Sequence, residues 1–168
     1  MLQRARGGTE LHGLARQLVS VHIRWVTIAT AAATSTAPMS AFLARWADMA
    51  TWPDWNLDTE WVRLDGPFET GATGTLKPKG GPKVRFTVTR LDDEAFVDVS
   101  SMPGAKVIFD HRFARTDDGG TRIDVTVDIT GPLALVWRTI LGGGFAKTLQ
   151  PDLDRLVATA ELDVATTG

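Results

Sequence analysis

Six short segments with the character of β-strands follow one another between Leu57 and Thr130, and a long helical segment with an apolar face comes directly after them. Their connections are short and rich in glycine, proline and aspartate, which is typical of tight turns. Short turns join antiparallel neighbours, and an apolar-faced helix after such strands usually covers one face of their sheet. The expected strands are residues 57–64, 71–77, 84–91, 95–101, 105–115 and 121–130.

The last two strand segments can be paired from their alternation of apolar and polar residues. Their apolar faces coincide when Phe113 lies opposite Ile123, which leaves a three-residue turn, Asp117–Gly119, that ends in glycine. The same register sets Arg112 opposite Asp124 on the outer face, as a favourable pair of opposite charges. Two independent patterns therefore favour one register for this hairpin.

The registers of the preceding strands follow from the lengths of their turns. A four-residue connection, Leu91–Glu94, pairs Val88 with Val97. The next turn is taken as three residues, Met102–Gly104. If that turn has only two residues, the register slips by one and every side chain of one strand changes face.

A first strand and two short helices are expected before this sheet. Residues Val21–Ala33 are rich in β-branched side chains and predict the strand. Pro38 suits the first turn of a helix, and a second short helix or turn over residues 48–55 is expected to end at Pro53.

Three consecutive glycines, Gly142–Gly144, divide the C-terminal helical segment, which extends from Pro132 to Leu162. A glycine in a helix interior costs about 1 kcal/mol relative to alanine. We therefore expect this helix to be bent or interrupted at the glycines.

The composition limits the kinds of protein that this chain can be. Its 168 residues suit one domain with a proper core, and a net charge of −2 provides no basic field for nucleic acid. There is no cysteine, and the three histidines (His12, His22 and His111) lack the spacing of a metal site. No apolar run reaches the roughly 20 residues of a membrane span, and no signal peptide is recognisable. We expect a cytoplasmic protein that needs no metal or other cofactor.

The chain divides into three parts on this basis. Residues 1–20 are expected to form an N-terminal extension outside the core, residues 21–162 the domain, and residues 163–168 a C-terminal tail.

Several local motifs resemble those of a known superfamily. They are Trp52–Trp55 (WPDW) after the helical pair, Gly131–Leu133 (GPL) at the start of the last helix, and Gly71 opening a strand shortly after Pro67. Over Val21–Leu162 the chain resembles the START-like (SRPBCC) superfamily, in particular its small bacterial polyketide cyclase/dehydrase-like branch. The resemblance implies an α+β helix-grip fold, with a curved seven-stranded antiparallel sheet wrapped around the C-terminal helix.

The resemblance also implies an elongated apolar cavity between the sheet and that helix. Members of the superfamily include aromatase/cyclases, lipid and sterol carriers and other ligand binders, so the fold alone does not decide the function. The leading hypothesis is a carrier or sequestering protein for a hydrophobic or aromatic small molecule, lipids included. The alternatives are a polyketide cyclase or aromatase that acts on a cavity-bound substrate, and a protein-interaction module that leaves the cavity unused.

His111 is the most informative polar residue. Its position in the strand places it on the inner face beside Phe109 and Phe113. Burial there favours the neutral imidazole, which we expect to be the polar anchor of the cavity and, for a cyclase, the candidate catalytic residue. No inward carboxylate is expected beside it. The candidate ligand-binding residues are Trp61, Phe86, Phe109, His111, Phe113 and Trp137.

Five basic residues gather on one hairpin of the expected sheet. Such a cluster is usually solvated, and it would otherwise attract an anionic ligand or an acidic carrier protein that bears a tethered chain. The basic residues are Lys77, Lys79, Lys83, Arg85 and Arg90.

Overall fold

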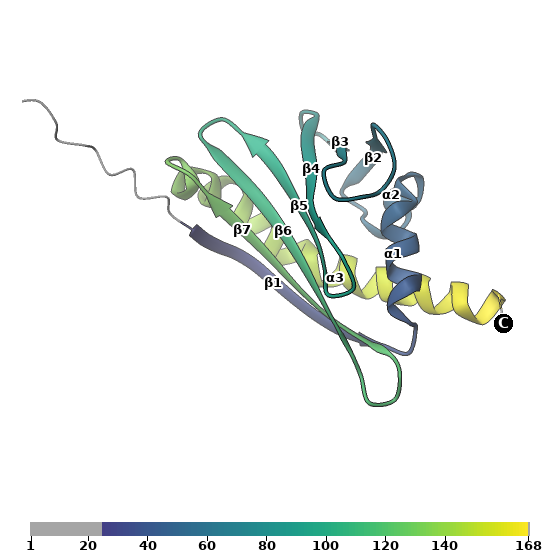
Figure 1. Cartoon of the computed structure of the whole chain (residues 1–168). Coiled ribbons are helices and arrows are strands. Elements are labelled where there is room, and N and C mark those ends of the chain that lie inside the picture. Colours follow the sequence, from purple (N-terminus) through teal and green to yellow (C-terminus); the bar gives the residue numbers. More distant parts are fainter. Residues whose placement is uncertain (1–24, 168) are drawn as a thin grey trace, which may run out of the picture.

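The computed structural model describes residues 25–167, which form a curved antiparallel sheet with a long helix along one side (Figure 1). The sheet has seven strands in the order β1-β7-β6-β5-β4-β3-β2. This is the expected helix-grip fold. The strands are β1 (Trp25–Ser35), β2 (Thr59–Leu64), β3 (Thr73–Pro78), β4 (Val84–Leu91), β5 (Ala95–Met102), β6 (Ala105–Arg115) and β7 (Thr121–Thr130).

Four helical segments accompany the sheet: α1 (Met39–Ala47), η1 (Met49–Thr51), α2 (Trp52–Trp55) and α3 (Ala134–Thr167). Phe42 and Trp46 of α1 are fully buried in the main core. Pro53 lies in the first turn of α2, so the expectation that it ends a helix is wrong. Proline is tolerated there because the first turn of a helix leaves its N–H groups without an intrahelical acceptor.

The expected domain, residues 21–162, and the described residues, 25–167, do not begin and end at the same positions. The N-terminal extension, residues 1–20, and the first part of the expected first strand, residues 21–24, lie outside the described residues. At the other end, α3 continues through residues 163–167, where a tail was expected. Asp163 accepts hydrogen bonds from the Arg45 guanidinium, and this ion pair joins α3 to α1.

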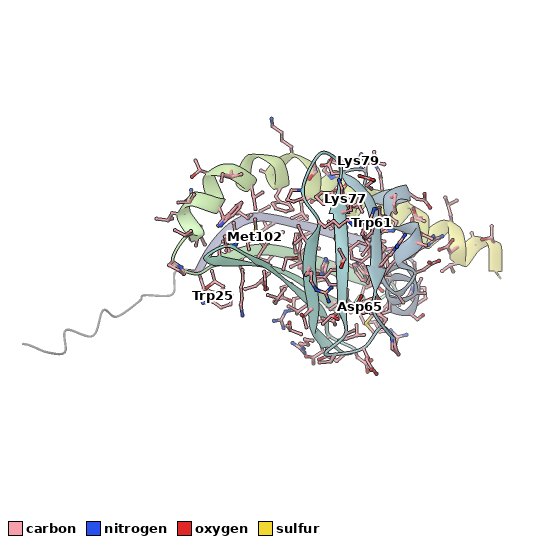
Figure 2. The ribbon with its side chains drawn as sticks, turned by 90° about the horizontal axis from the view of Figure 1, so that it is seen from above. Trp25, Trp61, Asp65, Lys77, Lys79 and Met102 are labelled. Atoms are coloured by element: carbon pink, nitrogen blue, oxygen red, sulfur yellow. The ribbon has the colours of Figure 1, made fainter. Side chains whose placement is uncertain are left out.

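Of the two expected outcomes at the glycines, a bend or an interruption, the interruption does not occur, because α3 is one continuous helix. Its axis changes direction along its length (Figure 2). Pro151 also lies inside the helix, where its ring nitrogen cannot donate a backbone hydrogen bond. Leu153 and Leu156 of this helix are buried in the main core, and this packing outweighs the poor helix preference of the glycines and the proline.

The predicted register of the last hairpin is confirmed. Phe113 lies opposite Ile123, and Arg112 lies opposite Asp124. The charges nevertheless pair along each strand: Arg112 contacts Asp110 at 2.8 Å and Arg122 contacts Asp124 at 2.6 Å. Residues two apart in a strand share a face, so each arginine finds its carboxylate without crossing to the next strand.

The register between β5 and β6 differs from the expected one. Met102 pairs with Ala105, so the turn consists of two residues, Pro103 and Gly104, rather than three. Gly104 has a φ of +65°, which a Pro-Gly turn requires at its second central position. The consequence is that the inner face of β5 carries Asp98, not Val97.

Two β-bulges also shift residues that the alternation placed elsewhere. In β4, Val88 lies opposite Asp98 and not opposite Val97 as expected, because Leu91 already pairs with Phe96 at the turn and the register then shifts by one between Val88 and Arg90. In β2, it shifts between Thr59 and Trp61. Each bulge inserts one unpaired residue and reverses the faces that follow it.

We predict that Gly142→Ala and Gly143→Ala each stabilise the protein by about 1 kcal/mol, because alanine favours the helix and a Cβ meets no atom closer than 3.9 Å. Urea unfolding measures the change. Gly131→Ala is the control and should destabilise, since Gly131 has a φ of +121° and a Cβ would lie 2.7 Å from the Gly104 carbonyl oxygen. An unchanged or lower stability of both helix variants would contradict the prediction.

Candidate functional site

A cavity of about 380 Å³ lies between α3 and the inner face of the sheet. Residues from α1, α2, the turn before β2 and all strands from β2 to β7 contribute to its walls. Six lining residues are aromatic: Trp46, Trp52, Trp55, Phe86, Phe109 and Phe145. The aliphatic and small residues of the lining are Leu76, Pro78, Val84, Met102, Val107, Val125, Ile140, Leu141, Gly144, Leu149, Leu153 and Leu156. Its polar residues are Asn56, Asp58, Thr59, Asp98, Ser100, His111, Thr148 and Asp152.

The cavity exists because α3 packs on one edge of the sheet. The helix packs mainly on β1, and it contacts β7 and β6 much less. The α1 and α2 helices brace the C-terminal half of α3. The inner face of the central strands is therefore covered by α3 much less closely than β1 is, and the cavity lies there.

Three of the six candidate ligand-binding residues line the cavity: Phe86, Phe109 and His111. Phe113 is buried instead against Trp46, with 5.3 Å between the ring centroids. Trp137 lies outside the cavity wall, and its indole Nε1–H donates to the Pro103 carbonyl oxygen at 2.9 Å. Trp137 therefore holds the start of α3 against the turn between β5 and β6.

Trp61, the sixth candidate, faces away from the cavity. The bulge in β2 turns it to the outer face, while Thr59 lines the cavity. The Arg63 guanidinium lies 4.9 Å and the Lys83 ammonium 5.5 Å from the Trp61 ring centroid. In Figure 2 Trp61 lies next to Lys77, its partner on β3. The expectation that Trp61 forms a cavity wall is wrong, because simple alternation does not foresee a bulge.

His111 occupies the inner face of β6, as expected. Its ring stacks on Phe96, with 4.9 Å between the ring centroids and 10° between the planes. Its ring centroid also lies 5.1 Å from that of Trp46. Its Nδ1 lies 3.0 Å from the Phe96 carbonyl oxygen. A carbonyl only accepts, so Nδ1 carries the proton and Nε2 is left as an acceptor. Burial lowers the pKa of His111 to about 4, so the ring is neutral at pH 7.

Asp98 is a site residue that the sequence did not reveal. It lies on the inner face of β5 between Phe109 on β6 and Val88 on β4, and only 8% of it is exposed. Within residues 25–167, Asp98 has no hydrogen-bond or ion-pair partner. Burial among these apolar neighbours raises the pKa of Asp98 to about 7. The signal that could have identified it is the Pro103-Gly104 pair, read as a complete two-residue turn.

Asp98 and His111 are diagonal neighbours on two adjacent strands. His111 lies opposite Phe96, and Phe109 lies opposite Asp98, which sets the two polar residues about 7–8 Å apart. The expectation that no inward carboxylate accompanies His111 is therefore wrong. At neutral pH a carboxyl group that retains part of its proton stands beside an imidazole with a free acceptor nitrogen. Such a pair can bind a hydroxyl, carbonyl or amino group, and it can move a proton.

A second polar region lies on the side of α3 and the turn before β2. Asp152 binds Arg155 at 2.8 Å, and burial raises the pKa of Asp152. Asp58 is exposed and also lines the cavity. Among the described residues, no three His, Cys, Asp or Glu side chains are grouped so as to hold a metal ion.

The basic hairpin is largely neutralised. Lys77 binds Glu60 at 3.1 Å, Arg85 binds Asp65 at 2.8 Å, and Lys83 lies over Trp61. Arg90 binds both Asp92 and Glu94. This surface therefore offers fewer unpaired cations than its sequence indicates.

With the fold and cavity established, the chain belongs to the family described as "Polyketide cyclase / dehydrase and lipid transport", whose model matches residues 26–161. This confirms the resemblance to the START-like superfamily. No curated protein matches the chain. Within the described part of the chain, no helix is both long and apolar enough to cross a membrane.

Solved structures share the fold at low sequence identity. The Zhui aromatase/cyclase from Streptomyces sp. R1128 is 20% identical, with a TM-score of 0.67 over 88% of this chain and 99% of that one. The di-domain aromatase/cyclase StfQ of the steffimycin pathway is 13% identical, with a TM-score of 0.66 over 84% of this chain and 52% of that one. Norcoclaurine synthase from Thalictrum flavum, in complex with dopamine and hydroxybenzaldehyde, is 12% identical, with a TM-score of 0.60 over 94% and 98%.

The opposite pKa shifts of Asp98 and His111 predict opposite pH dependences of stability. The folded pKa of Asp98 is raised, so wild type loses stability as the pH rises from about 4 to 7. The folded pKa of His111 is lowered, so wild type loses stability as the pH falls from about 6.5 to 4. Each shifted pKa changes the free energy of unfolding by at most about 4 kcal/mol across its pH range.

Single substitutions separate these two effects. As the pH rises from 4 to 7, the stability of Asp98→Asn should increase relative to that of wild type. As the pH falls from 6.5 to 4, the stability of His111→Gln should increase relative to that of wild type. Urea unfolding at half-unit pH intervals measures both differences, and a difference that does not change with pH would show that the residue is not buried as described.

Proposed function

We propose that this protein binds a hydrophobic small molecule with an aromatic or extended ring-like part in the cavity beneath α3, as a carrier or sequestering protein. The observation that supports this most is the cavity itself, about 380 Å³ of mainly apolar space with polar groups on the sheet and a second polar region on the side of α3. Ligand sites of proteins have this character and begin at a volume of about 300 Å³.

The lining favours a flat, ring-containing ligand. Six aromatic side chains surround the space, and aromatic rings pack well against each other's faces and edges. His111 Nε2 and the Asp98 carboxyl group would orient the ligand through its polar substituent. The complex of norcoclaurine synthase with dopamine and hydroxybenzaldehyde is a precedent for aromatic ligands on this fold.

Gly144 of α3 is both exposed and part of the cavity lining, so it lies where the cavity opens to solvent. Gly143 and Gly144 are adjacent, both are exposed, and a Cβ on either would meet no atom within 4 Å. Only Gly144 lines the cavity. We predict that Gly144→Leu weakens binding of 2-naphthol at least tenfold because its side chain fills the opening, while Gly143→Leu leaves binding unchanged. Quenching of tryptophan fluorescence measures both, and an equal effect of the two variants would contradict the position of the opening.

A second candidate function, a polyketide cyclase or aromatase, is favoured by the pairing of Asp98 with His111. In an aldol cyclisation, His111 Nε2 would take a proton from a methylene carbon between two carbonyls. That carbon would then attack a ketone carbon of the same chain, and the Asp98 carboxyl would protonate the resulting oxygen. Loss of water would complete the new ring.

This second function predicts a product that is lighter than the substrate by one water. A synthetic poly-β-ketone thioester, incubated with the protein and followed by mass spectrometry, should cyclise faster than without protein. Asp98→Asn and His111→Gln should each lower the rate at least tenfold, and Asp117→Asn in the exposed β6–β7 turn should not. Binding of the thioester without any acceleration would leave the carrier function alone.

A further inference from the structure

We propose that the ligand of this cavity carries a basic nitrogen, whose ammonium group binds beside Asp98. This inference rests on the proposed binding function and adds the chemical class of the ligand.

The charges of the cavity lining have a single sign. Asp58, Asp98 and Asp152 line it, and its lining contains neither lysine nor arginine. Arg155 is engaged with Asp152 at 2.8 Å, and Lys77 is engaged with Glu60 at 3.1 Å. Asp58 is exposed and Asp152 is paired, so Asp98 is the carboxylate of the lining whose charge its apolar surroundings screen poorly. The cavity therefore disfavours an anionic ligand and favours a cationic one.

Asp98 is the buried acidic residue of the lining that lacks a counterion. It is more than nine-tenths buried, lines the cavity, and has no partner in the part of the chain that the structure describes. Its cross-strand neighbours, Phe109 and Val88, offer no hydrogen-bond donor from their side chains. An ionised carboxylate in such surroundings is costly unless something pairs with it. A ligand ammonium group would supply that missing partner.

His111, the second polar group on this wall, also favours a ligand that donates hydrogen bonds. The Nδ1–H of His111 is used by the Phe96 carbonyl, so the Nε2 that remains is an acceptor. Asp98 and His111 together therefore present acceptors to a ligand, and an ammonium group has three N–H donors with which to meet them. A ligand carboxylate has only acceptors, finds no lysine or arginine in the lining, and would be repelled by Asp98 wherever that residue is ionised.

The aromatic walls add to this preference. Phe109 lies directly across from Asp98, and Trp46 contacts His111 at 5.1 Å. The faces of aromatic rings attract cations, most strongly where water is excluded. The rings can thus hold both the apolar body of the ligand and its charged end.

The same geometry predicts that binding releases protons. The other titratable groups of the lining are His111 on β6, Asp152 on α3 and Asp58 before β2. Free Asp98 keeps much of its proton below pH 7, because burial raises its pKa to about 7. An ammonium ligand stabilises the carboxylate, so at pH 6 the Asp98 proton passes to the buffer as the ligand binds. Affinity for the amine therefore rises with pH.

Three ligands of nearly equal shape test the proposal by calorimetry on the full chain: 2-(2-naphthyl)ethylamine, 2-(2-naphthyl)ethanol and 2-naphthylacetate. At pH 7.5 we expect the amine to bind at least tenfold tighter than the alcohol, and the carboxylate at least tenfold weaker. Between pH 5.5 and 7.5 the amine should gain roughly twentyfold over the alcohol, as the ionised fraction of Asp98 does. At pH 6 its binding heat should vary with the ionisation enthalpy of the buffer.

Substitutions then assign the preference to Asp98. Asp98→Asn should remove the advantage of the amine over the alcohol, while Asp117→Asn, with the same change in net charge, should leave both affinities unchanged. An amine that binds no tighter than the alcohol, or an advantage that survives in Asp98→Asn, overturns the inference and leaves the proposed function standing. The pH and buffer measurements on wild type decide the question even if Asp98→Asn does not fold. Binding of none of the three ligands overturns the proposed function, and this inference with it.

Discussion

The register between β5 and β6 decides which side chains face the cavity. It is set by the two-residue turn at Pro103 and Gly104, where the positive φ of Gly104 lets the chain reverse at once. Every second residue of β5 from Phe96 to Ser100 is thereby directed toward α3. With one more residue in the turn, valines would occupy this wall and Asp98 would face outward. The chemistry of the cavity therefore depends on the length of a single turn.

The edge-on position of α3 is the second condition for a cavity. The helix is held mainly to β1, and to α1 through the pair of Arg45 and Asp163. Because these contacts lie to one side, the central strands keep an uncovered apolar face. A protein of this size would normally fill such space with side chains, since close packing stabilises the core. The contacts of α3 with β1 and α1 therefore keep the cavity open.

Burial acts on Asp98 and His111 in opposite directions and gives them matching protonation states. Removal from water disfavours the charged form of either group, so the pKa of the carboxyl rises to about 7 and that of the imidazole falls to about 4. An aspartate and a histidine on a protein surface would form an ion pair at pH 6. Here the uncharged forms coexist, and each remains available to a ligand. This is why both a carrier and a proton-transfer role are compatible with one wall.

The sequence by itself determined the order of the elements, the antiparallel sheet, the register of the last hairpin and the inward position of His111. Those features follow from local rules, namely alternation along a strand and the preferences of glycine and proline in turns. The tertiary structure decided the bulges at Thr89 and Glu60, the length of the turn at Pro103 and Gly104, and the continuity of α3. Each of these depends on packing between distant segments, whose free energy exceeds the small local preferences that a sequence displays. Asp98 became part of the site through the register that the Pro103-Gly104 turn sets, and that pair is the one local sign of it, since the residues next to Asp98 give none.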